Sequence, residues 1–397
     1  MKSPAPNKPL VAIACGGTGG HLFPGIAVAE ELLRRDCDVT LVVSSKEVDQ
    51  HSVRSITDVE VQTVPAVGLT KGNFLGFAKG YWNSYRVAKS AFAKRPPKAI
   101  LSMGGFTSAA PAMAARSLGA KLFLHESNTI PGKANRWLAH FADQAFVYFH
   151  ETSSRLSIQK IETVGMPVRS QFLDPVDPLS SRMALGLDSH KPVLLVMGGS
   201  QGATGVNNLV LQALPLLIQQ FPNLQFLHLT GATEVERVRQ VYADKKVRAM
   251  VHPFLTEMEL ALGAATVAVS RSGASSIAEI AAMRLPSILI PYPHAADNHQ
   301  YYNALGLVES GAALVFDQNG VTTERFAAEI IELLKSDKLR TEMQTALAKW
   351  HHPEAAELIA TKIHQAITTP ETVKLQPGKA LPTPTPNPLK LEKEANV

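Results

Sequence analysis

Val11-Ala-Ile-Ala-Cys-Gly16-Gly17-Thr18-Gly19-Gly20 recurs in nearly the same spelling as Val193-Leu-Leu-Val-Met-Gly198-Gly199-Ser200-Gln201-Gly202. Each stretch is an apolar run followed at once by a glycine-rich turn. This order, with a helical pattern after it, is typical of the first strand of an open α/β sheet. Such sheets bind ligands beyond the carboxyl ends of their strands. The repeat therefore predicts two α/β halves with one ligand between them.

Length and composition agree with two domains. The chain has 397 residues, of which 45% are hydrophobic, and this length exceeds what one core usually organises. Its two cysteines, Cys15 and Cys37, exclude a disulfide framework and are typical of a reducing cytoplasm. The apolar run that ends at Cys15 is too short for a signal sequence or a spanning helix. We expect any membrane contact to be peripheral.

Apolar runs and helical patterns alternate along both halves, which predicts two doubly wound parallel sheets. The strands are expected at Leu10–Ala14, Val39–Val43, Ala99–Ser102, Lys121–Leu124 and Ala145–Tyr148, and then at Val193–Met197, Gln225–Leu229, Ala249–Val251, Thr266–Val269, Ser287–Ile290 and Ala313–Phe316. Helices are expected at Ile26–Arg35, Ser108–Leu118, Ala203–Phe221, Ser275–Met283 and Asn298–Ser310.

Prolines mark a hinge and a tail. In Val164–Arg169 and Asp174–Pro178 they interrupt both the helical and the strand pattern of apolar residues, so we place the hinge at about residues 165–175. From Thr369 onward the composition is polar and proline-rich, as in Leu381-Pro-Thr-Pro-Thr-Pro-Asn-Pro388. Residues 369–397 are therefore expected to be a disordered tail.

The glycine turns favour phosphate binding without a known nucleotide motif. Successive backbone N–H groups at a helix start form a concave anion site, to which the helix adds about half a positive charge. A P-loop is absent from the sequence, and the dinucleotide fingerprint fails because Leu22 stands at its last glycine. Asp36-Cys37-Asp38 resembles a metal-binding D-x-D motif, but a polar turn explains it better. We expect no cofactor and no obligatory metal.

A second anion site is predicted where Ser270-Arg-Ser-Gly-Ala-Ser-Ser-Ile-Ala-Glu279 follows a strand and opens a helix. Its backbone N–H groups and hydroxyls suit a diphosphate, and Glu279 offers two acceptor oxygens to a ribose diol. The alternative is an ordinary helix cap with a solvated glutamate. The proline-punctuated segment from Pro291 to Gln300 is dense in groups that hydrogen-bond sugars.

Basic residues are concentrated in one region. The net charge is +5, yet no acidic residue lies between Glu60 and Glu126. Within this region, bulky apolar and cationic side chains interleave as in interfacial segments, which predicts contact with an anionic membrane. The expected contacts are Lys71, Phe74, Leu75, Phe77, Lys79 and Trp82. A core helix with a solvated basic face is the alternative, and no nucleic-acid motif accompanies the charge.

Seven motifs together resemble those of the MurG family of bacterial cell-wall glycosyltransferases. They are Gly16-Gly-Thr-Gly-Gly-His21-Leu-Phe-Pro-Gly25, Ser102-Met-Gly-Gly-Phe-Thr-Ser108, His125-Glu-Ser-Asn128, Val164-Gly-Met-Pro-Val-Arg169, Gly198-Gly-Ser-Gln-Gly-Ala203, Ser270-Arg-Ser-Gly-Ala274 and Asp297-Asn-His-Gln300. The resemblance implies a GT-B fold, in which two Rossmann-like domains face each other across a cleft. It implies an N-terminal domain of residues 8–168 completed by a last helix at 352–367, and a C-terminal domain of residues 169–351.

The resemblance also implies a reaction and its site. The family transfers GlcNAc from UDP-GlcNAc to the MurNAc C4 hydroxyl of undecaprenyl-diphospho-MurNAc-pentapeptide (lipid I), with inversion, at the cytoplasmic face of the inner membrane. The implied donor contacts are Thr18, Gly19, Gly20, Asn128, Arg169, Ser200, Leu255, Ala274, Ser275, Ser276, Ile277, Ala278, Glu279 and Gln300, and the implied acceptor-diphosphate contacts are Gly16, Gly17, Gly104 and Gly105.

The general base is left open between two side chains. His21 follows the first glycine turn and has an ordinary pKa near neutrality, but it could equally order that turn. Glu126 is the second candidate, and it could equally brace Asn128. Two other functions also remain open, a UDP-GlcNAc 2-epimerase and a non-catalytic sensor of nucleotide sugars.

Overall fold

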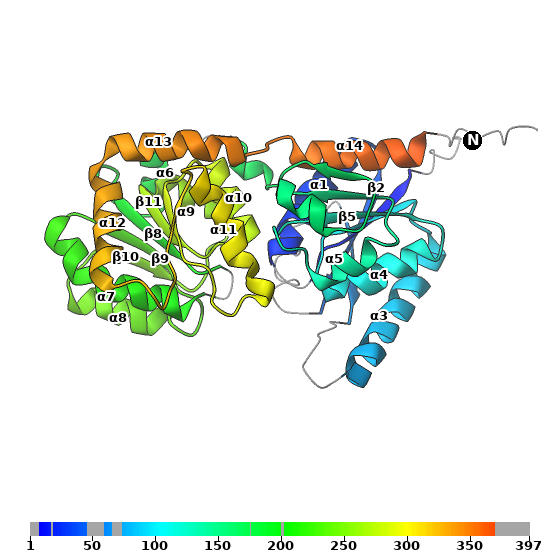
Figure 1. Cartoon of the computed structure of the whole chain (residues 1–397), viewed down its shortest axis with the longest axis horizontal. Helices are drawn as coiled ribbons and strands as arrows, with labels where there is room; N and C mark the ends of the chain where they lie inside the picture. The colour runs from blue at the N-terminus through cyan, green and yellow to red at the C-terminus, as the bar shows by residue number, and fades with distance from the viewer. Residues whose placement is uncertain are drawn as a thin grey trace, which may run out of the picture. The chain divides into compact units, whose positions relative to one another are not determined.

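The computed structural model describes residues 8–16, 19–45, 59–65, 74–174, 176–199 and 202–369. Its first sheet, on the right in Figure 1, contains β2 and β5 among its strands. It has seven parallel strands in the order β3-β2-β1-β4-β5-β6-β7. The strands are β1 Leu10–Ala14, β2 Asp38–Ser44, β3 Glu60–Val64, β4 Ala99–Ser102, β5 Lys121–Glu126, β6 Gln144–Val147 and β7 Ile161–Thr163. The helices with them are α1 Gly19–Arg34, α3 Phe74–Lys94, α4 Phe106–Arg116, α5 Lys133–Leu138, η1 His150–Arg155, η2 Ser170–Phe172 and α14 Ala355–Thr368.

The second sheet has six parallel strands in the order β10-β9-β8-β11-β12-β13. They are β8 Val193–Met197, β9 Gln225–Leu229, β10 Ala249–His252, β11 Val267–Ser270, β12 Ser287–Leu289 and β13 Leu314–Val315. Its helices are α6 Pro178–Ala184, α7 Thr204–Gln220, α8 Val235–Asp244, α9 Met258–Ala264, α10 Ala274–Ala282, η3 Ala296–Asn298, α11 His299–Glu309, α12 Thr323–Lys335, α13 Asp337–Leu347 and η4 Ala348–Trp350.

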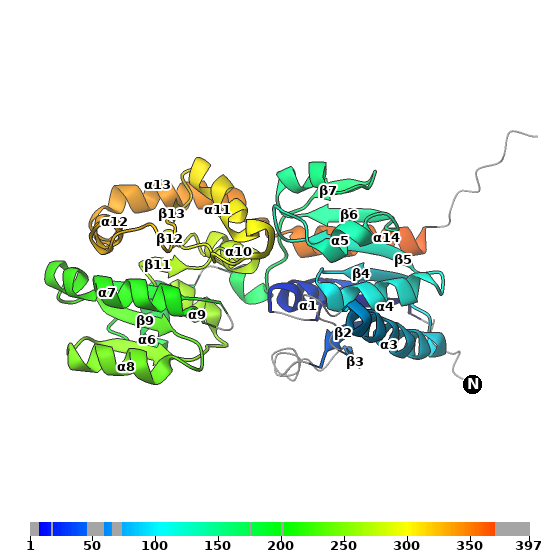
Figure 2. The ribbon, with the colours of Figure 1, turned by 60° about the horizontal axis from the view of Figure 1, so that its bottom comes forward.

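Both faces of the first sheet are covered by helices, as Figure 2 shows. Successive side chains of a strand point to opposite faces. Val11 and Ile13 accordingly join the cluster that contains α14, whereas Ala12 and Ala14 join the cluster that contains α4. Because both faces are buried, the strands have continuous apolar sequences instead of alternating ones.

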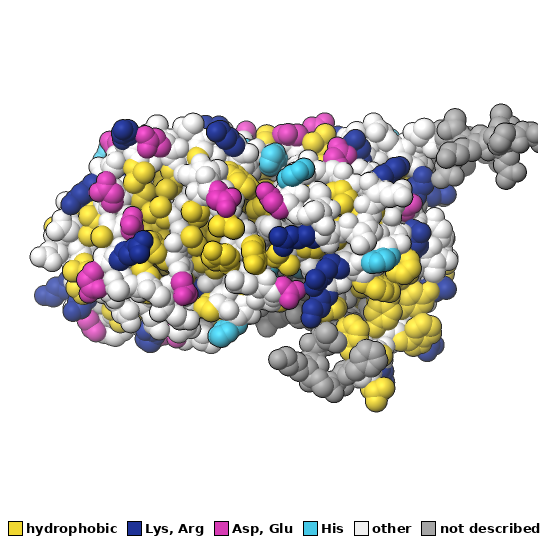
Figure 3. Space-filling view, viewed as in Figure 1, with side chains coloured by type: hydrophobic (Ala, Val, Ile, Leu, Met, Phe, Trp, Pro, Cys, Tyr) yellow, Lys and Arg dark blue, Asp and Glu magenta, His cyan; other side chains and the backbone are white. Residues whose placement is uncertain are grey.

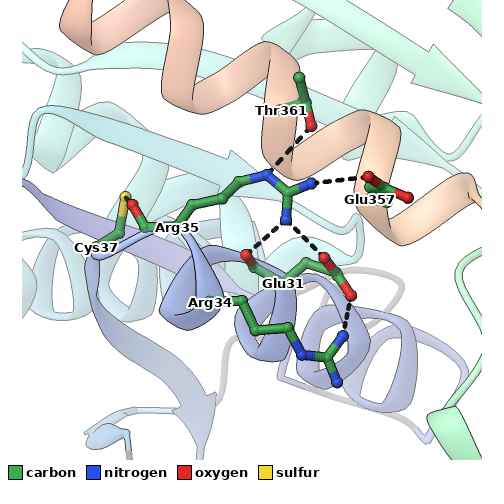
Figure 4. Close-up of polar contacts among 6 residues, drawn as sticks. All are labelled: Glu31, Arg34, Arg35, Cys37, Glu357 and Thr361. Atoms are coloured by element: carbon green, nitrogen blue, oxygen red, sulfur yellow. Dashed lines mark hydrogen bonds and ion pairs between the residues drawn. The ribbon is translucent and has the colours of Figure 1, made fainter.

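Helix α14 packs against α1 through polar contacts as well as apolar ones. The guanidinium of Arg35 donates to Thr361 Oγ1 at 3.1 Å and to the Glu31 carbonyl at 2.9 Å (Figure 4). It also pairs with the carboxylates of Glu31 and Glu357, at 2.6 and 3.3 Å. One arginine therefore joins the end of α1 to a helix more than three hundred residues later.

In both sheets the strand order reverses at the first strand, between β1 and β4 and between β8 and β11. Ligands of doubly wound sheets bind at such switch points. The turn after β1 includes Gly16, and β4 is followed by Gly104 and Gly105, while β8 is followed by Gly198 and β11 by Gly273. The topology thus places the predicted glycine-rich loops in pairs, one pair in each half.

The predicted two-sheet architecture is confirmed, but several elements differ. Edge strands β3 and β7 were not predicted, because they are short and only partly buried and so lack a continuous apolar run. Helix α1 begins at Gly19 and not at Ile26, since it tolerates Gly19, Gly20 and an internal Pro24 that read as a turn in the sequence. Among the described residues, no helix is long and apolar enough to cross a membrane.

Candidate functional site

A cavity of about 1040 Å³ lies at the β8/β11 switch point and extends to the first turn of α1. Nine of the predicted donor-binding residues line it: Gly19, Gly20, Arg169, Leu255, Ala274, Ser275, Ser276, Glu279 and Gln300. Thr18 and Ser200, together with Gly17 of the predicted acceptor site, lie outside the described residues. The structure therefore brings together loops from both halves around one space large enough for a nucleotide sugar.

Two helices direct uncapped N-termini at this cavity. Helix α7 has Ala203 and helix α10 has Gly273 at the N-cap, and neither position makes a side-chain cap hydrogen bond. Both residues line the cavity. Helix α6, in contrast, is capped by the Asp177 side chain and α12 by the Thr322 side chain. Their uncapped backbone N–H groups make the N-termini of α7 and α10 suitable for binding an anion.

Glycine is required at the turn before α7. Gly202 has φ +75, and a Cβ placed there would lie 2.2 Å from the Thr230 carbonyl oxygen. A side chain would also be strained in this left-handed region. The loop after β8 is therefore held close to the end of β9, which keeps the helix start open toward the cavity.

Arg169 and Glu279 form a weak ion pair on the cavity wall, with Nη2 and Oε1 3.8 Å apart. The guanidinium also lies over two rings, 4.5 Å from the Phe23 centroid and 5.0 Å from the Phe172 centroid. Its buried Nε has no hydrogen-bond partner in the described part of the chain. Arg169 is thus held mainly by aromatic faces, with donor groups left for a ligand.

Burial raises the pKa of Glu279 to about 7. The positive charge of Arg169 opposes this rise in pKa, and the carboxylate of Glu259 adds to it. Glu279 therefore exists as a mixture of acid and carboxylate near neutral pH. Only the carboxylate can accept hydrogen bonds from both hydroxyls of a diol with both of its oxygens.

Ser275 compensates for the proline inside α1. In an α-helix the Gly20 carbonyl would accept from the backbone N–H of residue 24. Pro24 has no N–H, so this hydrogen bond is missing. Ser275 Oγ donates to this carbonyl oxygen at 3.2 Å. The first turn of α1 and the N-terminus of α10 are thereby joined at the cavity.

Arg271 is a site residue whose role the sequence did not reveal. Its guanidinium is buried and donates to the carbonyl oxygens of Ile290 and Pro291, both at 3.0 Å, and to Gln318 Oε1 at 2.7 Å. It also lies 5.3 Å from the Tyr292 ring centroid. Burial lowers the pKa of Arg271 to about 10. Because its partners are mostly backbone carbonyls, no side-chain pattern in the sequence could indicate that it holds the loop after β12.

Glu126 is buried below the surface of the first half and does not line the cavity. Its Oε1 accepts from the Asn128 backbone N–H at 3.0 Å and from Asn128 Nδ2 at 3.2 Å. Its Oε2 accepts from the Gly132 N–H at 2.9 Å and from Asn135 Nδ2 at 3.0 Å. Burial raises the pKa of Glu126, and these hydrogen bonds oppose the rise. The contacts are those of a brace for the loop after β5.

His21 lies at the other switch point, between β1 and β4. A Cβ on Gly104 would be 3.2 Å from His21 Nε2, and one on Gly105 would be 3.4 Å from His21 Cε1 and 3.8 Å from the Gly16 carbonyl oxygen. The imidazole therefore packs on the glycines after β4. The predicted acceptor residues Gly16, Gly104 and Gly105 converge with His21 at a place separate from the donor cavity lining.

Three predicted donor contacts do not line the cavity. The Ile277 and Ala278 side chains are buried in the hydrophobic core of the second half, so only their backbone is available to a ligand. Asn128 lies in the loop braced by Glu126, and its side chain contacts the second half through Asn303.

The D-x-D sequence forms a polar turn in the structure. Asp36 has φ 59 and pairs with Lys8 at 2.8 Å, while Asp38 pairs with Arg95. Within the described ranges, no group of three or more His, Cys, Asp or Glu side chains is placed to hold a metal ion.

Two parallel-sheet domains with a nucleotide-sized cavity between their strand ends have the architecture of the GT-B class, and the family models identify a glycosyltransferase. The N-terminal domain model of glycosyltransferase family 28 matches residues 11–147, and its C-terminal domain model matches residues 193–359. The chain is 34% identical over 359 residues to a protein of Myxococcus xanthus. The match covers 88% of this chain and 91% of the relative. That relative is named UDP-N-acetylglucosamine--N-acetylmuramyl-(pentapeptide) pyrophosphoryl-undecaprenol N-acetylglucosamine transferase. The chain therefore belongs to this transferase family, which is called MurG.

Solved structures agree with this assignment. The crystal structure of MurG from Acinetobacter baumannii superimposes with a TM-score of 0.69 at 25% identity, covering 90% of this chain and all 100% of that one. A UDP-N-acetylglucosamine 2-epimerase superimposes with a TM-score of 0.63 at 12% identity, covering 89% of this chain and 95% of that one. The second likeness concerns the fold alone.

Proposed function

We propose that this protein transfers GlcNAc from UDP-GlcNAc to the MurNAc C4 hydroxyl of lipid I, forming lipid II with inversion at the sugar C1. The observation that carries the proposal is the cavity at the β8/β11 switch point, where uncapped helix N-termini, Arg169 and Glu279 face one space. Family membership supplies the sugar and the acceptor, because the relatives carry this activity in their name.

In the proposed donor complex, the second half binds the nucleotide. Glu279 accepts from the ribose hydroxyls, the Leu255 backbone contacts the uracil, and Gln300 contacts the sugar hydroxyls. Arg169 and the N-terminus of α10 bind the diphosphate. The complete set of proposed donor contacts is Thr18, Gly19, Gly20, Asn128, Arg169, Ser200, Leu255, Ala274, Ser275, Ser276, Ile277, Ala278, Glu279 and Gln300.

The acceptor diphosphate is proposed to bind at the β1/β4 switch point, on the backbone of Gly16, Gly17, Gly104 and Gly105. His21 packs against two of these glycines and is our candidate for the base. Glu126 is the weaker candidate for the base, because four hydrogen-bond donors already occupy its two oxygens.

The proposed step is a single displacement. The acceptor C4 oxygen forms a bond to C1 of the sugar as the bond from C1 to the diphosphate oxygen breaks, and His21 takes the hydroxyl proton. UDP leaves with the electron pair. Arg169 and the helix N-terminus stabilise its developing charge, so we propose that no divalent ion is obligatory. Turnover that is lost on chelation and restored by one cation would refute this part.

We propose a membrane contact at the cytoplasmic face of the inner membrane, made by Phe74, Leu75, Phe77, Lys79 and Trp82 of α3 together with Lys71, which precedes this helix in the sequence. Lys71 and the Phe74 side chain lie outside the described residues. Leu75 is 84% exposed and Trp82 59% exposed, and hydrophobic side chains gather around α3 and α4 in Figure 3. Helix α3 carries basic residues and no acidic one, which suits an anionic headgroup layer.

The domain division is proposed to follow the two sheets, with residues 8–168 and 352–367 in the first domain and 169–351 in the second. It is supported by α14, whose Ile359 and Ile363 belong to the cluster of the first sheet. We assign no role to the tail of residues 369–397, of which 370–397 lie outside the described residues.

The activity is tested by incubating the protein with UDP-GlcNAc and a short-chain lipid I analogue. A lipid-linked disaccharide and one UDP per sugar transferred are expected. Release of N-acetylmannosamine without a disaccharide would identify an epimerase, and UDP-GlcNAc binding without turnover would identify a sensor.

Two substitutions then test the site. We expect His21→Ala to lower kcat far more than donor affinity, whereas the exposed His190→Ala should change neither. Wild-type turnover of His21→Ala would remove its proposed role. Glu279→Ala should instead weaken UDP-GlcNAc binding, and unchanged affinity would reject the ribose contact.

A further inference from the structure

Asn303, in the first half of α11, connects three of the motifs that we assign to the donor site. It is fully buried, and no motif in the sequence singled it out. Its Nδ2 donates to Asn128 Oδ1 at 3.0 Å and to the Ser272 carbonyl at 3.3 Å. Its Oδ1 accepts from the Thr129 backbone N–H at 2.9 Å. One carboxamide therefore satisfies partners from both halves of the protein.

The network continues from Ser272 to the loop that carries Gln300. Ser272 Oγ donates to the Gln300 carbonyl at 2.8 Å, and Gln300 Oε1 accepts from the Tyr292 backbone N–H at 2.9 Å. Ser272 is itself fully buried. The position of Asn128 is thus fixed relative to the residue that precedes the N-cap of α10 and to Gln300.

Asn303 also determines which way the Asn128 amide faces. Asn128 Nδ2 donates to Glu126 Oε1 at 3.2 Å and to Ser127 Oγ at 3.2 Å, while its Oδ1 accepts from Asn303. Flipping the amide would place its NH₂ group against Asn303 Nδ2, which is also a donor, and its oxygen against Glu126 Oε1, which is also an acceptor. The amide orientation of Asn128 is therefore fixed, with one lone pair of its oxygen engaged by Asn303 and the other held in a fixed direction.

We propose that Asn303 is a positioning residue for the donor sugar, acting through Asn128, and that it tunes recognition of the sugar and not of the uridine diphosphate. The inference rests on the proposed function, because that function assigns Asn128 to the sugar. Two other contacts join the same regions of the two halves: Thr129 Oγ1 donates to the Tyr302 carbonyl at 3.3 Å, and Arg136 pairs with Asp297 at 3.0 Å. That pair is exposed and does not touch Asn128, so it provides a matched control.

The test compares four variants: Asn303→Ala, Asn303→Asp, Asn128→Ala and the control Arg136→Gln. Asn303→Asp keeps the acceptor for the Thr129 N–H but loses both donated hydrogen bonds. For the Asn303 variants we expect kcat/KM for UDP-GlcNAc to fall by about tenfold or more, as for the loss of one buried hydrogen bond to substrate. Their affinity for UDP should stay within about twofold of wild type. Retained UDP affinity also shows that the second half is folded, and Asn303→Ala keeps the test valid if Asn303→Asp does not fold.

A double variant separates positioning from simple packing. If Asn303 acts through Asn128, adding Asn303→Ala to Asn128→Ala should cost little more than Asn128→Ala alone. Equal losses of UDP and UDP-GlcNAc affinity, or fully additive losses of kcat/KM, would overturn the inference. Wild-type kcat/KM in Asn128→Ala would instead overturn the assignment of Asn128 in the proposed function, and the inference with it.

Discussion

Donor binding should release a proton, and Glu279 should be its source. Burial raises the pKa of Glu279 to about 7 in the unliganded protein. A ribose diol needs the carboxylate, so bound UDP-GlcNAc should hold Glu279 ionised. At a pH equal to its pKa about half of the molecules carry the proton, and binding should therefore release about half a proton per site. Below that pH the affinity should weaken by up to about tenfold per pH unit.

Isothermal titration in two buffers of different ionisation enthalpy measures this release directly. UDP-GlcNAc is the suitable ligand, because its diphosphate diester does not titrate near neutral pH, unlike the terminal phosphate of UDP. Glu279→Gln never ionises, so its affinity should be lower but nearly constant across the same pH range.

A second ionisable group on the cavity wall supplies the control. This group is the imidazole of His294, which lines the same cavity. We expect His294→Gln to keep the proton release of the wild type. The reasoning is refuted if Glu279→Gln still releases the proton, or if wild-type affinity does not change with pH.

Three further outcomes follow from the geometry. Gly165→Ala should lower Tm more than Gly119→Ala. Both glycines have positive φ, but only at Gly165 would an added Cβ lie 2.4 Å from His352 Cβ. Equal shifts in a thermal melt would contradict this contact. Trp82→Ser should weaken partitioning onto anionic vesicles by about tenfold and leave UDP-GlcNAc affinity unchanged, and an unaltered partition would remove α3 from the membrane contact. Glu126→Gln should reduce the free energy of unfolding in urea by about 1–3 kcal/mol, because its new NH₂ group must face N–H donors, and an unchanged midpoint would contradict the bracing role.

The sequence predicted what depends on local pattern. Continuous apolar strands and glycine turns predicted the two sheets, and nine of the residues predicted to bind the donor line one cavity. The two glycine loops at each switch point also follow from parallel topology, because consecutive carboxyl ends meet at one edge. The position of Glu279 on the cavity wall follows from the same topology, since it lies just over one turn into a helix that opens at such an edge, while its ribose contact stays a prediction.

What the sequence could not give depends on contacts between distant segments. Asn303 is an ordinary residue within a helix until Asn128 and Ser272 are placed beside it. The raised pKa of Glu279 is a result of burial, which one sequence does not show. The start of α1 was missed because Gly19, Gly20 and Pro24 resemble a turn in the sequence, which does not show that Ser275 donates to the Gly20 carbonyl.

The position of Arg169 explains why the pH dependence should belong to Glu279 alone. The ion pair between them is long, at 3.8 Å, whereas two aromatic rings hold the guanidinium at 4.5 and 5.0 Å from their centroids. Protonation of Glu279 removes the attraction between the two side chains, and the rings should still keep the guanidinium where it is. The diphosphate would then meet the same positive charge at every pH near neutrality. Replacing Phe23 by leucine should break this independence, so that diphosphate binding itself becomes sensitive to the charge on Glu279.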